Sequence, residues 1–146
     1  MEVQRGNFSI STDPSRLDRE VIHDYLSRFS YWAKGIPREI VDRGIDGSLN
    51  FGVYDGDAQV GFARIITDRA TFAYLCDVFI LESHRGQGLG VSLMETVRAH
   101  PDLQGLRRWV LATRDAQGLY RKTGFRDIEQ PVRYMEIIDR GIYERK

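Results

Sequence analysis

The sequence predicts a mixed α/β fold, in which one central sheet carries helices on both of its faces. The main evidence is an apolar run of strand character at 72–81, which ends in a glycine-rich bend and is followed by an amphipathic helix. A second observation is the hairpin signal Asp55-Gly56, which lies between two segments of alternating apolar and polar residues. Strands and helices do not alternate one by one, so a regular βαβ fold is not expected.

Length and composition are those of a globular protein with one core. The 146 residues are too few for two ordinary cores, and we expect a single domain over 1–146. The chain has 21 Lys and Arg residues and 21 Asp and Glu residues, so its formal net charge is zero. A neutral chain is not drawn electrostatically to nucleic acid or to an anionic membrane, and neither partner is expected. Cys76 is the only cysteine, which excludes an intramolecular disulfide, and the histidines lack ligand spacing, so no metal is expected. The N-terminus lacks a signal-peptide core, and no apolar run reaches the roughly 18 residues of a membrane span, so we expect a cytoplasmic protein.

The N-terminal segment is expected to form a strand and two helices. Alternating residues at 8–12 predict a short strand, and Asp13-Pro14 supplies an N-cap with proline at the first helical position. Apolar residues then recur at spacings of three and four as far as Phe29, which predicts one helix whose apolar stripe faces the core. A shorter helix begins near Pro37.

The middle of the chain is expected to supply the centre of the sheet. The segments 49–53 and 60–66 form the two strands of the hairpin, and Gly61 indicates a bulge in the second one. The next strand, 72–81, is apolar at nearly every position and should be buried on both faces. Asp77 is the exception within it.

The last part of the chain is expected to complete the sheet. The apolar segment 106–112 predicts a strand, and Asp115 can cap a short helix that ends at Gly124. A closing pair of strands is expected at 125–128 and 132–138.

The glycine-rich bend predicts a phosphate site. Gly86, Gly88 and Gly90 open a helix directly after a strand, where bare backbone N–H groups and the positive end of the helix dipole favour phosphate oxygens. The dinucleotide fingerprint would need a glycine or alanine where Val91 stands, and the P-loop would need Gly-Lys followed by Ser or Thr. A nicotinamide enzyme and an NTPase are therefore both disfavoured.

Two segments carry a family resemblance. Arg85, Gly88 and Gly90 resemble the pyrophosphate-binding signature of the GCN5-related N-acetyltransferases (GNAT family), which reads Arg or Gln, two residues, Gly, one residue, and Gly or Ala. The segment 111–125 resembles the family's strand-to-helix passage, with its Leu-Tyr and Gly-Phe ending. The resemblance implies a mixed, mostly antiparallel central sheet with helices on both faces. It also implies an N-acetyltransferase that moves an acetyl group from acetyl-CoA to a primary amine of a small molecule or peptide.

The resemblance assigns expected cofactor contacts. Backbone N–H groups of the bend would bind the pyrophosphate, and the strand before it would pair with the pantetheine arm. The residues concerned are Val78, Phe79 and Ile80 on the strand and Arg85, Gly86, Gln87, Gly88, Leu89, Gly90 and Val91 in the bend. Thr113 stands where many relatives have an asparagine, so its contact with the cofactor is an open question.

The resemblance also suggests catalytic groups. Tyr120 matches a tyrosine that protonates the departing thiolate, and a phenol of ordinary pKa about 10 keeps its proton at neutral pH. The alternative for Tyr120 is a packed core tyrosine. A backbone N–H near Ile80 would stabilise the oxyanion. Tyr31 and Trp32 are expected either to line the acceptor pocket or to serve as surface or core aromatics.

Asp77 is the candidate general base, because it is the one carboxylate inside the central apolar strand. The alternatives are Glu82, Asp68, a water chain without a single base, and a structural pairing of Asp77 with an arginine such as Arg64. A rival hypothesis for the whole chain is a non-catalytic acetyl-CoA-binding regulatory module. A homodimer through edge strands or C-terminal elements is compatible with the sequence.

Overall fold

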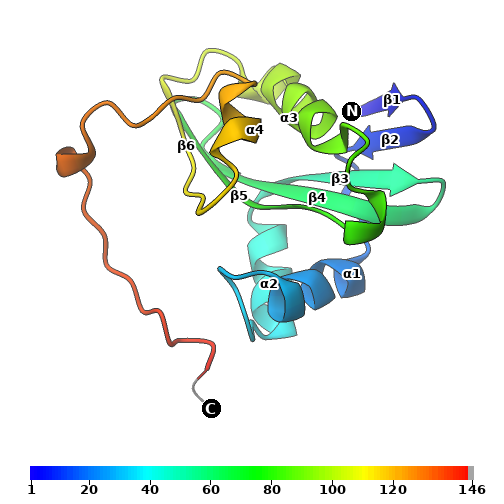
Figure 1. The fold of residues 1–146 in the computed structure, drawn as a ribbon, viewed down its shortest axis with the longest axis horizontal. Coiled ribbons are helices and arrows are strands. Elements are labelled where there is room, and N and C mark those ends of the chain that lie inside the picture. The colour runs from blue at the N-terminus through cyan, green and yellow to red at the C-terminus, as the bar shows by residue number, and fades with distance from the viewer. Residues whose placement is uncertain (145–146) are drawn as a thin grey trace.

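The computed structural model describes residues 1–144. Its six strands form one sheet, in which they lie side by side in chain order (Figure 1). The strands are β1 (Glu2–Arg5), β2 (Phe8–Ser11), β3 (Leu49–Asp55), β4 (Ala58–Thr67), β5 (Phe72–Ile80) and β6 (Arg108–Val110). The α-helices are α1 (Arg19–Asp24), α2 (Arg38–Asp46), α3 (Leu89–Ala99) and α4 (Gln117–Arg121). All neighbouring strands are antiparallel except the parallel pair β5–β6. The expected mixed, mostly antiparallel sheet is confirmed.

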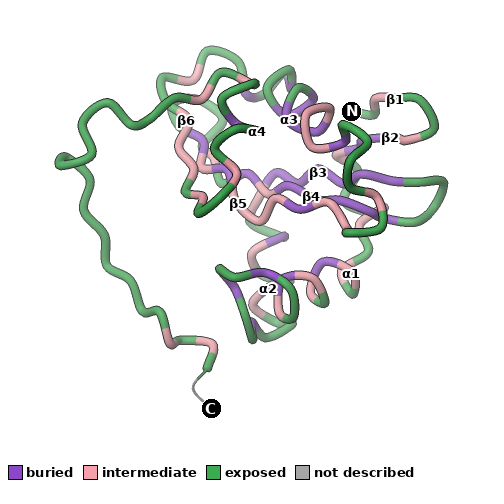
Figure 2. The backbone as a smooth tube through the Cα atoms, in the orientation of Figure 1, coloured by how far each residue is buried: buried purple, intermediate pink, exposed green. Residues whose placement is uncertain are grey.

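Helices cover both faces of the sheet, as predicted. In Figure 1, α1 and α2 lie on one face, and α3 and α4 lie on the other. The α3 face holds a core that includes Phe51, Leu93 and Val97. The opposite face packs Ile22 and Phe62 among the first two helices. Because both faces are covered, the central strands β3 and β4 are buried along most of their length (Figure 2).

The single helix expected up to Phe29 is wrong. The segment divides into a 3-10 turn (Pro14–Arg16), α1, and one turn of π-helix (Tyr25–Phe29). Asp13 caps only the 3-10 turn, and Asp18 starts α1 by accepting a hydrogen bond from the backbone N–H of Val21 at 3.2 Å. The end of the apolar stripe does not reach the core, because Phe29 is 62% exposed. Strand β1 was not predicted, since its residues lack an alternating pattern.

The β3–β4 hairpin and its bulge are confirmed. Asp55 pairs with Ala58 across a two-residue loop in which Gly56 has a φ of +61°. The register shifts beside Gly61, as expected for a bulge. A Cβ at Gly61 would lie 2.7 Å from the Cδ1 atom of Ile80 and 3.0 Å from the Cβ atom of Val53, so a side chain at this position would crowd both neighbouring strands.

The C-terminal part departs most from the prediction. Strand β6 has three residues instead of the seven expected, and no closing strand forms at 125–128 or 132–138. A 3-10 turn (Pro131–Arg133) and exposed extended chain occupy this region, which swings away from the body (Figures 1 and 2). Val132, Met135 and Ile137 are almost fully exposed, and Tyr134 contacts β6 only through the side chain of Arg108, so no strand pairing forms here. Within residues 1–144, no helix has the length and hydropathy that a membrane span requires.

Candidate functional site

A cleft opens where β5 and β6 separate. The two strands pair only through Phe72–Tyr74 and Arg108–Val110, so the outer edge of β5 beyond Tyr74 has no strand partner among residues 1–144. The cleft has a volume of about 780 Å³. Its walls include Tyr31, Trp32, Asp77, Val78, Phe79, Ile80, Arg85, Gly86, Gly88, Leu89, Gly90, Thr113 and Tyr120. Most of the sequence-predicted site residues therefore meet in one place, and Gln87 and Val91 are the two that do not line the cleft.

The cleft explains why β5 is not buried on both faces. Ala73, Leu75 and Phe79 are buried, whereas the residues between them are half-buried because they face the cleft. The predicted burial on both faces is therefore wrong. At Asp77 the backbone has a φ of +55°, and the pairing register with β4 shifts, so this residue forms a bulge in the middle of the strand.

The end of β5 presents backbone groups to the cleft. The backbone N–H of Leu81 donates to the carbonyl oxygen of Val60 on β4 at 2.8 Å. Successive residues of a strand direct their backbone groups to opposite edges, so the N–H and C=O of Ile80 point away from β4. The guanidinium of Arg85 donates through Nε to the Ile80 carbonyl oxygen at 3.0 Å, which leaves the Ile80 N–H facing the cleft.

The glycine bend provides a helix N-terminus without a side-chain cap. Gly86 and Gly88 have φ values of +79° and +77°, and Gly88 is the N-cap of α3. No side chain caps this helix, so its first N–H groups lack the partners that a capping residue supplies. No atom lies within 4 Å of a Cβ placed at Gly86 or Gly88, so the approach to these N–H groups is open.

Arg85 holds the bend rather than projecting freely. Besides its bond to Ile80, it donates through Nη2 to the hydroxyl oxygen of Tyr25 at 3.0 Å. Tyr25 in turn stacks on Phe79 of β5, with ring centroids 4.1 Å apart. The bend, β5 and the π-helical turn are thus joined at one end of the cleft.

Tyr120 lies deep in the wall of the cleft. Its side chain is 9% exposed, and its ring packs edge-to-face on Phe125 at 5.9 Å. Burial, with smaller contributions from Tyr31 and Asp115, raises the pKa of Tyr120 to about 12. The phenol therefore keeps its proton at neutral pH and can donate it.

The side chain of Thr113 caps the start of α4. Its hydroxyl oxygen accepts a hydrogen bond from the backbone N–H of Ala116 at 3.1 Å. The expectation that Asp115 caps this helix is wrong: Ala116 is the N-cap position, and Asp115 forms an ion pair with Arg114 at 3.8 Å. Thr113 reaches this position because its hydroxyl is three residues before the N–H that needs a partner.

Tyr31 and Trp32 join the two sides of the cleft. The hydroxyl oxygen of Tyr31 accepts a hydrogen bond from the backbone N–H of Arg114 at 2.8 Å, and the Arg114 guanidinium lies 4.0 Å above the Tyr31 ring. Trp32 donates through Nε1 to Oδ1 of Asp77 on β5 at 2.8 Å. Both aromatic side chains line the cleft and are 42% and 40% exposed.

Asp77 is held from two sides. Its Oδ2 accepts a hydrogen bond from Nε of Arg64 at 2.8 Å, while Oδ1 is bonded to Trp32. The two charged side chains are only 12% and 20% exposed, and Arg64 also donates to the hydroxyl oxygen of Ser48. Burial acts against the charged form of Arg64, but Cys76 and Asp77 raise its pKa overall. The arrangement favours the structural ion pair over a free general base.

The alternative bases do not line the cleft. Asp68 accepts hydrogen bonds from the hydroxyl of Thr71 and from three backbone N–H groups of the β4–β5 turn, and these bonds lower its pKa. Glu82 lies exposed in a 3-10 turn after β5. Cys76 does line the cleft, but burial raises its thiol pKa to about 12, so it is no ready nucleophile.

Several lining residues were not predicted as site residues: Tyr25, Phe29, Tyr74, Cys76, His84, Arg114, Asp115, Ala116 and Leu119. Tyr25 and Phe29 fell on the apolar stripe, where their spacing indicates core packing. The π-helical turn moves them to the cleft, and helical periodicity gives no signal of such a turn. Arg114 and Asp115 lie within the family-like segment 111–125, so the resemblance is the signal that could have identified them.

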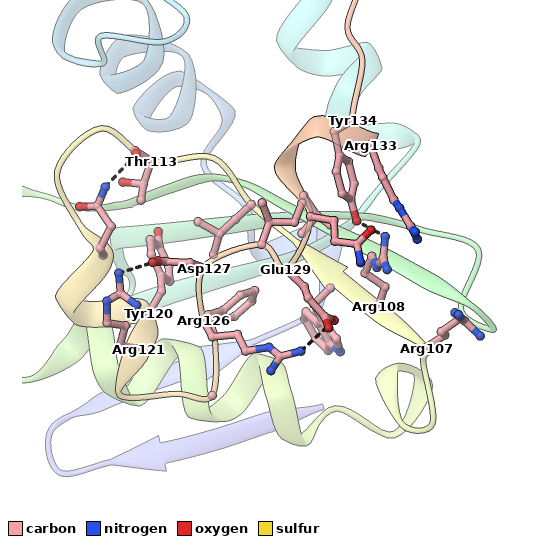
Figure 3. Close-up of a pocket in the computed structure, with 18 of the residues that line it drawn as sticks. Arg107, Arg108, Thr113, Tyr120, Arg121, Arg126, Asp127, Glu129, Arg133 and Tyr134 are labelled. Atoms are coloured by element: carbon pink, nitrogen blue, oxygen red, sulfur yellow. Dashed lines mark hydrogen bonds and ion pairs between the residues drawn. The ribbon is translucent and has the colours of Figure 1, made fainter.

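A second cavity lies between β6, α4 and the start of the C-terminal segment (Figure 3). Its volume is about 910 Å³, and it shares Leu111, Thr113 and Tyr120 with the cleft. Arginines surround much of it, including Arg107, Arg108, Arg121, Arg126 and Arg133. Among the described residues, no group of three or more His, Cys, Asp or Glu side chains is arranged to hold a metal.

Comparisons with known proteins show which family this chain resembles. A family model described as an acetyltransferase (GNAT) domain matches residues 46–127. A Gibberella zeae protein named as an acetyltransferase, FG08082, is 34% identical over 149 residues, which cover 86% of this chain and 83% of that protein. A GNAT-family crystal structure from Xanthomonas campestris pv. campestris is 51% identical with a TM-score of 0.93, covering 97% of this chain and 100% of that one. A GNAT-family structure from Elizabethkingia anophelis with acetyl-CoA bound is 18% identical, with a TM-score of 0.62 over 94% of this chain and 92% of that one, and it shares the fold.

Proposed function

This chain belongs to the GNAT family of acetyltransferases, and we propose that it moves the acetyl group of acetyl-CoA directly to a primary amine of a small molecule or peptide. The observation that carries the proposal is the cleft, which follows the unpaired edge of β5 and ends at the uncapped N-terminus of α3. GNAT proteins use acetyl-CoA, whose amide-bearing pantetheine suits a free strand edge and whose pyrophosphate suits a helix N-terminus. We further propose that residues 1–146 act as one domain in the cytoplasm; the single six-stranded sheet with helices on both faces supports the one domain.

The cofactor contacts follow from these two features. Val78 would pair through its backbone with a pantetheine amide, as a strand pairs with a sheet edge, whereas Ile80 offers only its N–H because its carbonyl oxygen is bonded to Arg85. The N–H groups between Gly86 and Val91 would bind the pyrophosphate. Each hydrogen bond to a charged group contributes roughly 1.5–3 kcal/mol net, so a few such bonds anchor the cofactor. Arg85 would act by holding the bend in place, because its guanidinium is already bonded to Ile80 and Tyr25.

Tyr120 would serve as the general acid. Bound acetyl-CoA supplies the thioester, and its sulfur needs a proton as the acetyl group leaves. A phenol with a pKa of about 12 holds that proton at neutral pH and lies in the wall of the cleft. The Ile80 N–H would stabilise negative charge on the thioester oxygen.

The acceptor amine would enter beside Tyr31 and Trp32. It must lose a proton to attack, which at pH 7 costs roughly 4–5 kcal/mol for a lysine-like amine and roughly 1 kcal/mol for an α-amine. Asp77 was the sequence-based candidate for this proton, but both of its oxygens already accept hydrogen bonds. We therefore propose that Asp77 holds Trp32 in place. Water at the mouth of the cleft would accept the proton of the amine.

Two measurements test the proposal. Calorimetric titration should detect acetyl-CoA binding, and thiol release should report turnover across a panel of amines, aminoglycosides, amino acids and peptides. The pH dependence of the Asp77→Asn variant tests the base: an unchanged acidic limb supports our assignment, whereas its loss would return Asp77 to the role of base. Absence of binding heat at millimolar acetyl-CoA would refute the cofactor site. Binding without turnover of any amine would instead favour a regulatory module.

A further inference from the structure

Exposed aromatic side chains gather at one side of the cleft. Among residues 1–125, six large hydrophobic side chains are exposed, and three of them, Phe29, Tyr31 and Trp32, stand within four positions of the chain. All three line the cleft, together with the partly buried Tyr25 and Tyr74. We call these five residues the aromatic wall. Exposed aromatic surface concentrated in a pocket indicates a ligand that is itself largely apolar.

The aromatic wall lies on the α1–α2 side of the sheet. Ala73 and Leu75 of β5 pack in the core beneath α3, so Tyr74 between them points to the opposite face. Phe79 belongs to the core cluster of that opposite face, and Tyr25 packs against the same cluster beside α1 and α2 (Figure 1). The uncapped helix N-terminus that suits the pyrophosphate belongs to α3, on the other side of the sheet. The aromatic wall is therefore available to the acceptor.

The turn that carries Tyr31 and Trp32 is held firmly by its own chain. Ser30, which is buried, donates through its hydroxyl to the carbonyl oxygen of Leu26 at 2.6 Å and accepts from the backbone N–H of Ala33 at 3.0 Å. The hydrogen bonds of Tyr31 and Trp32 across the cleft fix the two rings themselves. Because rings that are already fixed lose little freedom when they pack on a ligand, this wall favours a rigid, flat partner.

The charges that line the cleft do not suit a polycation. Asp77 and Asp115 are the two carboxylates among the described lining residues. Asp77 is paired with Arg64, and Asp115 lies 3.8 Å from Arg114. Arg85 adds a further positive charge to the lining. A polyamine or an aminoglycoside carries several ammonium groups that need carboxylate partners when they leave water, and both lining carboxylates already have arginine partners.

We propose that the acceptor is a primary amine joined by a short linker to an aromatic ring, and that this ring lies against the aromatic wall. The inference rests on the proposed acetyl transfer and names the substrate class for it. Aromatic rings prefer offset-stacked or edge-to-face contacts with centroids about 4.5–7 Å apart. Tyr31 and Trp32 meet edge-to-face at 5.0 Å, and the ring of Phe29 is tilted on that of Tyr25 at 6.0 Å. An acceptor ring extends these pairs in the same geometry.

Transfer to such an amine exchanges a thioester bond for an amide bond. The protonated amine first gives one proton to water. Its nitrogen then bonds to the acetyl carbon as the carbon–sulfur bond breaks, and Tyr120 gives its proton to the departing sulfur. The second proton of the nitrogen returns to Tyr120 through water, which leaves an N-acetyl amine and a free thiol. The aromatic wall moves no proton in these steps, so its residues should affect KM more than kcat.

Matched amines test the substrate class. Thiol release at saturating acetyl-CoA is compared for 2-phenylethylamine, 2-cyclohexylethylamine, n-butylamine and spermidine. The value of kcat/KM for 2-phenylethylamine should exceed that for n-butylamine by about 10-fold or more, because the ring buries apolar surface on the wall. It should exceed the value for 2-cyclohexylethylamine by about 3-fold or more, since only an aromatic ring gains the ring-to-ring contacts. Spermidine should be the poorest acceptor of the four.

Phe29→Ala tests the aromatic wall itself. This variant should raise KM for 2-phenylethylamine by about 5-fold or more and leave KM for n-butylamine unchanged, because n-butylamine has no ring to lose the contact. Phe72→Ala is the matched control, since Phe72 is also an exposed aromatic residue but does not line the cleft. It should leave both KM values unchanged. Melting temperatures show that both variants are folded, and calorimetric titration of 2-phenylethylamine in the presence of CoA measures the same difference in affinity without turnover.

The outcomes separate this inference from the proposed function. Spermidine, n-butylamine or 2-cyclohexylethylamine used as efficiently as 2-phenylethylamine would overturn the inference and leave acetyl transfer standing. The same holds if KM in Phe29→Ala is unchanged or rises equally for the ring-bearing and ring-free amines. Binding of acetyl-CoA without thiol release from any amine would overturn the proposed function, and the inference with it.

Discussion

Replacing Tyr120 with phenylalanine removes one hydroxyl and little else. The ring keeps its contact with Phe125, and among residues 1–144 the hydroxyl forms no hydrogen bond that would be lost. The free energy of unfolding should therefore change by less than about 1 kcal/mol, and acetyl-CoA affinity should stay within about 3-fold. The turnover number should fall by about 10²–10⁴-fold, the contribution of a positioned acid, which corresponds to about 2.7–5.4 kcal/mol.

Thiol release under saturating acetyl-CoA measures this turnover, and calorimetry measures the affinity. Tyr54→Phe is the matched control, because Tyr54 is 1% exposed, lies outside the cleft, and also has a pKa raised to about 12 by burial. Its hydroxyl is buried without a hydrogen-bond partner among the described residues, so removing it should stabilise the fold by about 1 kcal/mol and leave turnover unchanged. A turnover number within about 3-fold of wild type for Tyr120→Phe would refute the acid role.

Three further predictions concern the fold and the cofactor site. Asp77→Asn should lower the free energy of unfolding by about 2–3 kcal/mol, because it leaves the mostly buried charge of Arg64 without its counter-ion; denaturant unfolding measures this, and an unchanged midpoint would contradict the ion pair. Gly88→Ala should cost about 1–2 kcal/mol, because its φ of +77° strains any side chain, and should also weaken acetyl-CoA binding; retained affinity in calorimetry would mean that the pyrophosphate lies elsewhere. The pKa values of Cys76, Tyr54 and Tyr120 are each raised to about 12 from 9 or 10, so their contribution to stability is complete below about pH 9 and is lost as pH rises toward 12. A melting temperature that stays level between pH 9 and pH 12 would contradict these shifts.

Local pattern predicted the parts of the fold whose causes are local. The β3–β4 hairpin depends on a glycine with positive φ between alternating segments, and α3 depends on a glycine bend before an apolar stripe, so both follow from neighbouring residues. The prediction of one long first helix failed because two carboxylates compete to cap its start. Asp13 caps a 3-10 turn and Asp18 starts α1, and spacing alone does not indicate which cap is used.

The walls of the cleft depend on contacts between distant residues. Trp32 reaches Asp77 across 45 positions of the chain, and Tyr31 reaches the backbone of Arg114 across 83. The sequence could name these aromatic residues as candidates, but only the tertiary structure could separate lining the pocket from packing in the core. The same holds for the role of Asp77, since a carboxylate in an apolar strand is equally a base or half of an ion pair until its partners are known.

The closing strands expected at 125–128 and 132–138 also depend on contacts outside their own segment. Residues 132–138 have the β-branched and aromatic content of a strand, and that content is a property of the segment itself. A strand also needs a neighbour, and no local pattern says whether the neighbour belongs to the same chain. Here Val132, Met135 and Ile137 face solvent, and Tyr134 contacts only the side chain of Arg108 on β6, so the segment has no backbone partner among residues 1–144. The β-branched and aromatic content therefore predicted a strand, but a strand forms only where a sheet edge meets the segment in register.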